Sequence, residues 1–141
     1  MASKRVYVDH LSRVGLFEGF SRKDLEKIAV AGDHIGLKAG RQLFAQNTDG
    51  NEGYVVLSGT VRVQRNGKTV TTLGPGAIIG ELALLDQGPR TASASCVTDC
   101  EVLVLSRASF RGLIDQVPAL SHKLLATLAG RVRDLDQRSY G

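Results

Sequence analysis

The sequence has few aromatic residues, no tryptophan and only two cysteines. Aromatic residues make up 5% of the 141 positions, so aliphatic side chains have to fill the core. Cys96 and Cys100 are too few for a disulfide framework, and one such pair with three scattered histidines lacks the ligand spacing of a zinc site. We therefore expect two small, packed thiols in a reducing compartment, the cytoplasm, and no metal site.

Long apolar runs and clusters of one charge are also missing. No segment approaches the roughly 18–20 apolar residues of a membrane span, and the basic N-terminus has no apolar signal-peptide core behind it. The net charge of +4 favours anionic partners, but the lysines and arginines are spread along the whole chain, without the basic run of a nucleic-acid surface. With 43% hydrophobic residues, the length suits one domain over residues 1–141.

Hydrophobic periodicity divides this domain into helical residues 1–32, a strand-rich zone 33–106 and helical residues 107–141. In the middle zone, short alternating stretches such as "TVRVQRNG" and "KTVTTLG" are separated by turn residues, and Asn66-Gly67 is a strong two-residue hairpin signal. Eleven of the 16 glycines lie between positions 32 and 88, as expected where tight turns follow one another. We predict a mainly β fold with flanking helices, an antiparallel, jelly-roll-like β-roll.

The outer zones carry helix signals at their ends. Ser21 is placed to cap a helix that Gly32 ends. After the strands, a short helix stops before Pro118, and a longer one begins there.

The last helix carries an apolar seam. The residues Leu125, Leu128, Val132 and Leu135 are spaced by 3, 4 and 3 positions, a pattern that suits a helix pair in a homodimer. The alternative is packing against the chain's own barrel, where we also place Leu120 and Leu124.

One segment interrupts the strands: "GELALLDQGPRTASA", residues 80–94. A helical turn inserted there presents N–H groups that favour an anion, and Gly80 allows a ligand to approach the backbone closely. The guanidinium of Arg90 suits a pair of phosphate oxygens, while the carboxylate of Glu81 suits a hydroxyl donor. A ligand with both a phosphate and a sugar hydroxyl satisfies both side chains, which indicates a nucleotide.

Each of these residues also has an ordinary explanation. Glu81 can be an acid at a helix N-terminus, Arg90 a solvated base after a turn proline, and Thr91 a strand residue. We favour the nucleotide site because the three occur together, at this spacing, within this pattern of strands.

The segment resembles the phosphate-binding cassette of the cyclic nucleotide-binding domain family, in Gly80-Glu81-Leu82-Ala83 and again in Pro89-Arg90-Thr91-Ala92. The likeness also covers the leading helices ("LSRVGLFEGFSRKDLEKIA"), the central strands ("GYVVLSGTVRV") and the closing helices. It implies that Arg90 pairs with the cyclic phosphate and that Glu81 takes the ribose 2′-hydroxyl. The remaining contacts that it implies come from Gly80, from the N–H groups of Leu82, Ala83 and Ala92, and from the hydroxyl and N–H of Thr91.

The same resemblance does not decide which purine base the bound nucleotide carries. A threonine after the cassette arginine can contact guanine, yet bacterial catabolite activators carry a small hydroxyl residue there and respond to cAMP. We expect cAMP, with cGMP as the alternative. The family often caps the purine with its last helix, where this chain offers Asp136 as an acceptor and Arg131, Arg138 or Tyr140 for stacking; a solvated helix face is the other explanation.

Three functions follow from these observations. The first is a cyclic nucleotide sensor that couples binding to movement of its C-terminal helices, and so to an effector protein or a dimer. The second is the regulatory part of a catabolite-activator-like transcription regulator, whose recognition helix would follow residue 141, where we expect this chain to end without a DNA-binding domain. The third is an enzyme on a cupin-like barrel; we expect none, because His10, His34 and His122 do not form a ligand cluster.

Overall fold

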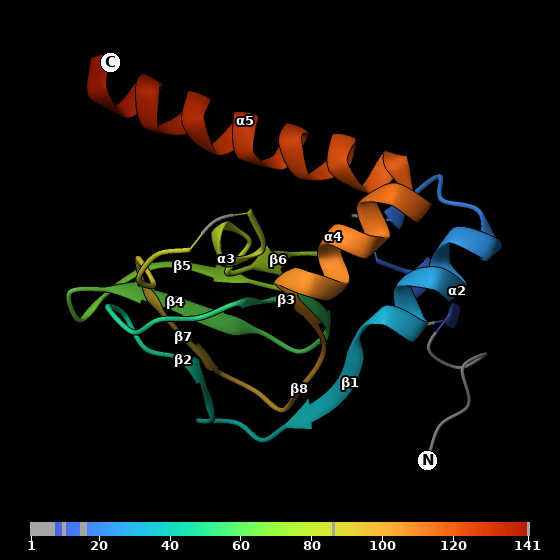
Figure 1. Cartoon of the computed structure of the whole chain (residues 1–141). Coiled ribbons are helices and arrows are strands. Elements are labelled where there is room, and N and C mark those ends of the chain that lie inside the picture. Colours follow the sequence, from blue (N-terminus) through green and yellow to red (C-terminus); the bar gives the residue numbers. More distant parts are fainter. Residues whose placement is uncertain (1–7, 10, 15–16, 86, 141) are drawn as a thin grey trace.

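The computed structural model describes residues 8, 9, 11–14, 17–85 and 87–140, and it leaves out the side chains of Thr127 and of residues 131–140. Two four-stranded antiparallel sheets form a roll, which confirms the predicted fold class (Figure 1). In chain order the elements are α2 (Arg22–Ala31), β1 (Asp33–Leu37), β2 (Gln42–Phe44), β3 (Glu52–Ser58), β4 (Val61–Arg65), β5 (Lys68–Leu73), β6 (Ile78–Ile79), α3 (Leu82–Leu85), β7 (Ser93–Cys96), β8 (Cys100–Ser106), α4 (Arg107–Gln116) and α5 (Pro118–Tyr140). None of the helices described is long and apolar enough to cross a membrane.

The two sheets have the strand orders β1-β8-β3-β6 and β2-β7-β4-β5. The strands β4 and β5 pair as the predicted hairpin, with Arg65 opposite Lys68. Its turn residues Asn66 and Gly67 have φ values of 54° and 79°, the left-handed pair that a tight two-residue turn requires.

The strands β3 and β8 lie in the middle of the first sheet and are buried on both faces. Val55 and Leu103 face a core shared with the helices, whereas Val56 and Val102 face the interior of the roll. This double burial explains why "YVVL" and "VLVL" are continuous apolar runs rather than strict alternations of apolar and polar residues.

The helix α2 begins as predicted, because the Ser21 side chain accepts a hydrogen bond from the Asp24 amide. It also ends at Gly32, but Gly32 has an extended backbone with φ −110°, not the left-handed cap that a terminal glycine suggests. The need for glycine is steric: a Cβ at this position would lie 2.9 Å from the Leu103 side chain and from the Val104 carbonyl oxygen.

The closing helices α4 and α5 begin at Arg107 and Pro118, and α4 ends before the proline as predicted. Leu120 and Leu124 are buried in the core shared with α2 and α4, which confirms that they dock on the body of the domain. Leu128 packs partly against the same core, and Leu125 is 63% exposed. The side chains of Val132 and Leu135 lie outside the described residues, so the seam as a dimer contact stays a prediction.

Both cysteines are buried and free, as expected for packed thiols. Cys96 and Cys100 flank the β7–β8 turn and face the interior of the roll. Burial, together with the smaller effect of the contact with Cys100, raises the pKa of Cys96 to about 11.

Candidate functional site

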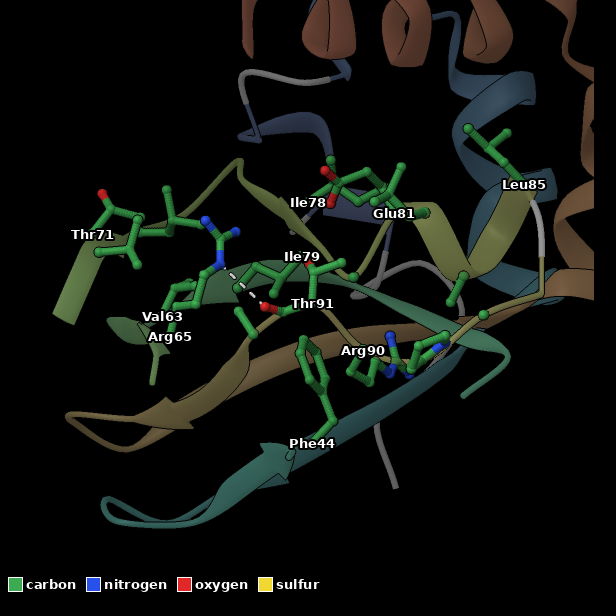
Figure 2. Close-up of a pocket in the computed structure, with 18 of the residues that line it drawn as sticks. Phe44, Val63, Arg65, Thr71, Ile78, Ile79, Glu81, Leu85, Arg90 and Thr91 are labelled. Carbon is green, nitrogen blue, oxygen red and sulfur yellow. Dashed lines mark hydrogen bonds between the residues drawn. The ribbon is translucent and has the colours of Figure 1, made fainter. Parts of the chain in front are cut away.

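A cavity of about 680 Å³ lies between the segment 78–92 and the strands β4 and β5 (Figure 2). All seven residues predicted to bind a ligand line it: Gly80, Glu81, Leu82, Ala83, Arg90, Thr91 and Ala92. The fold thus brings both halves of the predicted motif to one cavity. Figure 1 shows α5 passing along the side of the roll that carries α3 and β6.

Arg90 is the main charged group of this cavity, and it is buried. Only 7% of the residue is exposed, which excludes a solvated surface base. Its Cζ atom lies 4.2 Å from the centroid of the Phe44 ring, which is a cation–π contact; Figure 2 shows the two side chains next to each other. Its Nε and Nη1 atoms have no hydrogen-bond partner among the described residues.

Burial lowers the pKa of Arg90 from its ordinary value, and the nearby Tyr54 and Glu52 oppose this shift. A buried cation with unused donors is costly unless an anion or acceptor completes it. The donors of a guanidinium match two oxygens of a phosphate, a sulfate or a carboxylate. The Nε and Nη1 donors of Arg90 are therefore suited to an anionic ligand.

The loop between β2 and β3 holds Arg90 in place. The Arg90 amide donates to the Thr48 carbonyl over 2.7 Å, and the Asn47 amide donates to the Arg90 carbonyl over 2.8 Å. Gly50 lies directly against the side chain, since a Cβ on Gly50 would lie 2.5 Å from Arg90 Cζ. These contacts fix both the backbone and the guanidinium of Arg90.

Glycine is required at position 80 for two reasons. Its φ of +73° lies in the left-handed region, and a Cβ there would lie 2.6 Å from Arg90 Nη1. Glu81 follows it directly before α3 and is 5% exposed, so its carboxylate is buried beside the cavity.

One expected amide donor is already engaged. The Ala83 N–H donates to the Gly80 carbonyl over 3.1 Å, because α3 is a single turn whose first amides close onto the residues before it. This N–H therefore has an acceptor within the chain, and its contact with a ligand stays a prediction.

Thr91 lies outside the strands, since β7 begins only at Ser93. Its carbonyl accepts a hydrogen bond from Arg65 Nε over 3.2 Å, the dashed contact in Figure 2. Arg65 comes from β4 and lines the cavity together with Val63 and Thr71. In Figure 2 these three side chains lie on one side of the cavity, and Phe44 and Arg90 lie on another.

Sequence reasoning missed several residues of this site. Phe44, Gly50, Arg65 and Thr71 come from separate strands and loops, and no local pattern links them to the segment 80–92. The suggested base cap of Arg131, Asp136, Arg138 and Tyr140 has its backbone in α5, but those side chains lie outside the described residues. The part of the chain that the structure describes holds no cluster of three or more potential metal ligands.

Residues 35–117 match the family model of the cyclic nucleotide-binding domain. The chain belongs to the cyclic nucleotide-binding domain family. In this family it is similar to the cyclic AMP receptor protein of Thermus thermophilus, with 42% identity over 126 residues that cover 86% of this chain and 58% of that protein. It is also similar to the CRP-like cAMP-activated global transcriptional regulator of Mycobacterium tuberculosis, with 30% identity over 128 residues, 87% of this chain and 57% of the regulator.

A solved cyclic nucleotide-binding fold agrees with these matches. The crystal structure of the Thermus thermophilus catabolite activator protein superposes with a TM-score of 0.81 at 37% identity, over 87% of this chain and 60% of that one. The chain thus spans a little over half the length of these relatives.

Proposed function

We propose that this chain is a sensor domain that binds a cyclic nucleotide, cAMP, in the cavity beside α3. The observation that carries the proposal is the buried guanidinium of Arg90, whose Nε and Nη1 atoms have no partner among the described residues. In the proposed complex Arg90 pairs with the cyclic phosphate, and the buried carboxylate of Glu81 accepts the ribose 2′-hydroxyl. The amides of Leu82, Thr91 and Ala92 and the Thr91 hydroxyl complete the phosphate cradle, and Gly80 leaves room for it.

In the proposed complex the purine base packs against the wall of the cavity that phosphate and ribose do not contact. With phosphate and ribose at Arg90 and Glu81, the purine lies toward Val63, Val70 and Leu73, apolar side chains from β4 and β5. The choice of cAMP over cGMP rests on the names of the two relatives described above, both of which refer to cyclic AMP.

The proposed role is regulatory binding, not catalysis. Nucleotide binding would shift the C-terminal helices α4 and α5. This movement would change the contact with an effector protein, or with a second copy of the chain in a dimer formed through the seam of α5. A switch of this kind requires that the ligand contact the two states differently.

A second candidate is supported by the lengths of the relatives. The chain aligns with 57% and 58% of the two regulators, which supports the alternative proposal that it is the regulatory part of a catabolite-activator-like transcription regulator. In that case the same nucleotide site would control a DNA-binding partner domain.

Calorimetric titration of the unfolded, washed and refolded protein tests the site itself. We expect saturable binding of cAMP near one molecule per chain, weaker binding of cGMP, and little binding of 5′-AMP, which shares the base and ribose but lacks the cyclic phosphate. Absence of binding by both cyclic nucleotides in the folded protein would contradict the proposal.

A further inference from the structure

The side chain of Arg107 connects α4 to α3, which lines the cavity, and to the loop that contacts Arg90. Arg107 is the first residue of α4, yet its Nε donates to the Ala83 carbonyl of α3 over 2.8 Å. Its Nη2 donates to the Gly50 carbonyl over 3.4 Å, and its own amide donates to the Asn51 carbonyl over 2.7 Å. One residue thus links α4 to α3 and to the loop before β3.

The helix α4 does not need this side chain for its own start. Ser106 is its N-cap, and the Ser106 hydroxyl oxygen accepts a hydrogen bond from the Ser109 amide over 3.1 Å. The half-buried guanidinium of Arg107 is instead directed back to carbonyl oxygens of α3, which lines the cavity, and of the loop before β3.

Gly50 gives this link its connection to the ligand. The residue that accepts from Arg107 through its carbonyl also lies against the Arg90 guanidinium, with no room for a Cβ between them. The neighbouring Asp49 pairs with Pro89, and the Thr48 carbonyl binds the Arg90 amide. Gly50 and the loop 47–50 thus join the Arg90 guanidinium to the side chain of Arg107.

We propose that Arg107 is a positioning residue that transmits occupation of the Arg90 site to α4; this rests on the proposed function. Arginine suits the role because its planar fork reaches two carbonyl oxygens at once, while a lysine ammonium is a compact charge without that fork. When nucleotide fixes Arg90, the Gly50 and Ala83 carbonyls hold Arg107, and the first turn of α4 becomes more rigid.

Hydrogen–deuterium exchange of the full chain, with and without saturating cAMP, tests the proposal. In the native sequence we expect cAMP to slow exchange in residues 45–51, 80–92 and 107–116. In Arg107→Met the slowing in 45–51 and 80–92 persists, but the slowing in 107–116 is lost. Because coupling between sites is reciprocal, the variant's affinity for cAMP also falls, by about fivefold or more.

Two further variants separate this role from a merely structural one. Arg107→Lys keeps the charge and one contact, so it should recover part of the slowing of exchange in α4. If Arg107→Met does not fold, Arg107→Lys takes its place in the exchange experiment. Arg111→Met changes an exposed arginine of the same helix and should behave like the native sequence.

The outcomes are distinct. If Arg107→Met and Arg107→Lys bind cAMP and slow α4 exchange as the native chain does, the transmission role is wrong and the nucleotide site stands. If the folded native chain binds neither cAMP nor cGMP, the nucleotide site itself is wrong and the transmission role falls with it.

Discussion

The guanidinium carbon of Arg90 lies 4.2 Å from the centre of the Phe44 ring, although 46 positions separate these residues in the sequence. The ring also stacks with Tyr54, with centroids 5.8 Å apart and planes inclined by 29°. This aromatic support places a cation in an apolar setting and leaves the Nε and Nη1 donors of Arg90 without described partners. Such an arrangement favours binding of an anion at the expense of the stability of the ligand-free protein.

Replacing Arg90 with methionine should abolish tight nucleotide binding without destabilising the ligand-free protein. Loss of one partner of a buried charge pair costs about 2–5 kcal/mol, equivalent to about 30-fold to several thousand-fold in affinity. Methionine fills similar volume and removes the desolvated charge, so the melting temperature of the free protein should be unchanged or higher. Calorimetric titration and thermal melting measure the two effects.

The control for this variant is Arg62→Met, which removes an exposed arginine of β4 that does not line the cavity. It should bind cAMP like the native chain. Native-like affinity of Arg90→Met would show that this guanidinium does not hold the phosphate.

Replacing Glu81 with alanine tests the ribose contact. Hydrogen bonds to charged groups contribute about 1.5–3 kcal/mol, so cAMP affinity should fall by about 10- to 150-fold. The 2′-deoxy analogue lacks the hydroxyl, so the same substitution should weaken its binding much less. Titration of both ligands into both proteins gives a double-mutant cycle.

Equal losses for the two ligands in Glu81→Ala would assign the carboxylate a structural role. Asp115→Ala, an exposed acid on α4, provides the matched control and should change neither affinity.

Replacing Gly50 with alanine should weaken nucleotide binding although Gly50 itself carries no side chain. The added Cβ would overlap the Arg90 guanidinium and displace it from the position set by Phe44. Gly74→Ala is the control, because a Cβ there would meet nothing within 4 Å. We expect at least a tenfold difference in cAMP affinity between the two variants; similar affinities would mean that the position of Arg90 is not critical.

The thiols should be unreactive in the folded protein. Burial raises the pKa of Cys96 to about 11, so its thiolate is scarce near neutral pH. Ellman's reagent at about pH 8 should label both thiols promptly in concentrated guanidinium chloride and very slowly in buffer. Fast labelling of the native protein would place these cysteines at an accessible surface.

The same shift has a definite effect on stability. The raised folded-state pKa means that the stabilising contribution of Cys96 is complete below the ordinary thiol pKa of 9.0 and is lost as pH rises toward about 11. The denaturation midpoint should therefore decline over this window, and Cys96→Ala should reduce the slope of that decline.

Several local features of this protein follow from its sequence alone. Ser21 caps a helix, Asn66-Gly67 turns a hairpin and Pro118 starts α5, because each depends on a hydrogen bond or a backbone preference within a few residues. The segment 80–92 was likewise recognisable, since its acid, glycine and arginine lie close together in the chain.

Tertiary packing assembles those local features into a site. It buried Arg90 against Phe44, set Gly50 against its guanidinium and brought Arg65 from β4 to the Thr91 carbonyl. It also engaged the Ala83 amide and gave Gly32 a steric rather than a conformational role. These relationships depend on which strands pair and which surfaces pack, and packing between distant segments leaves no local signal in the sequence.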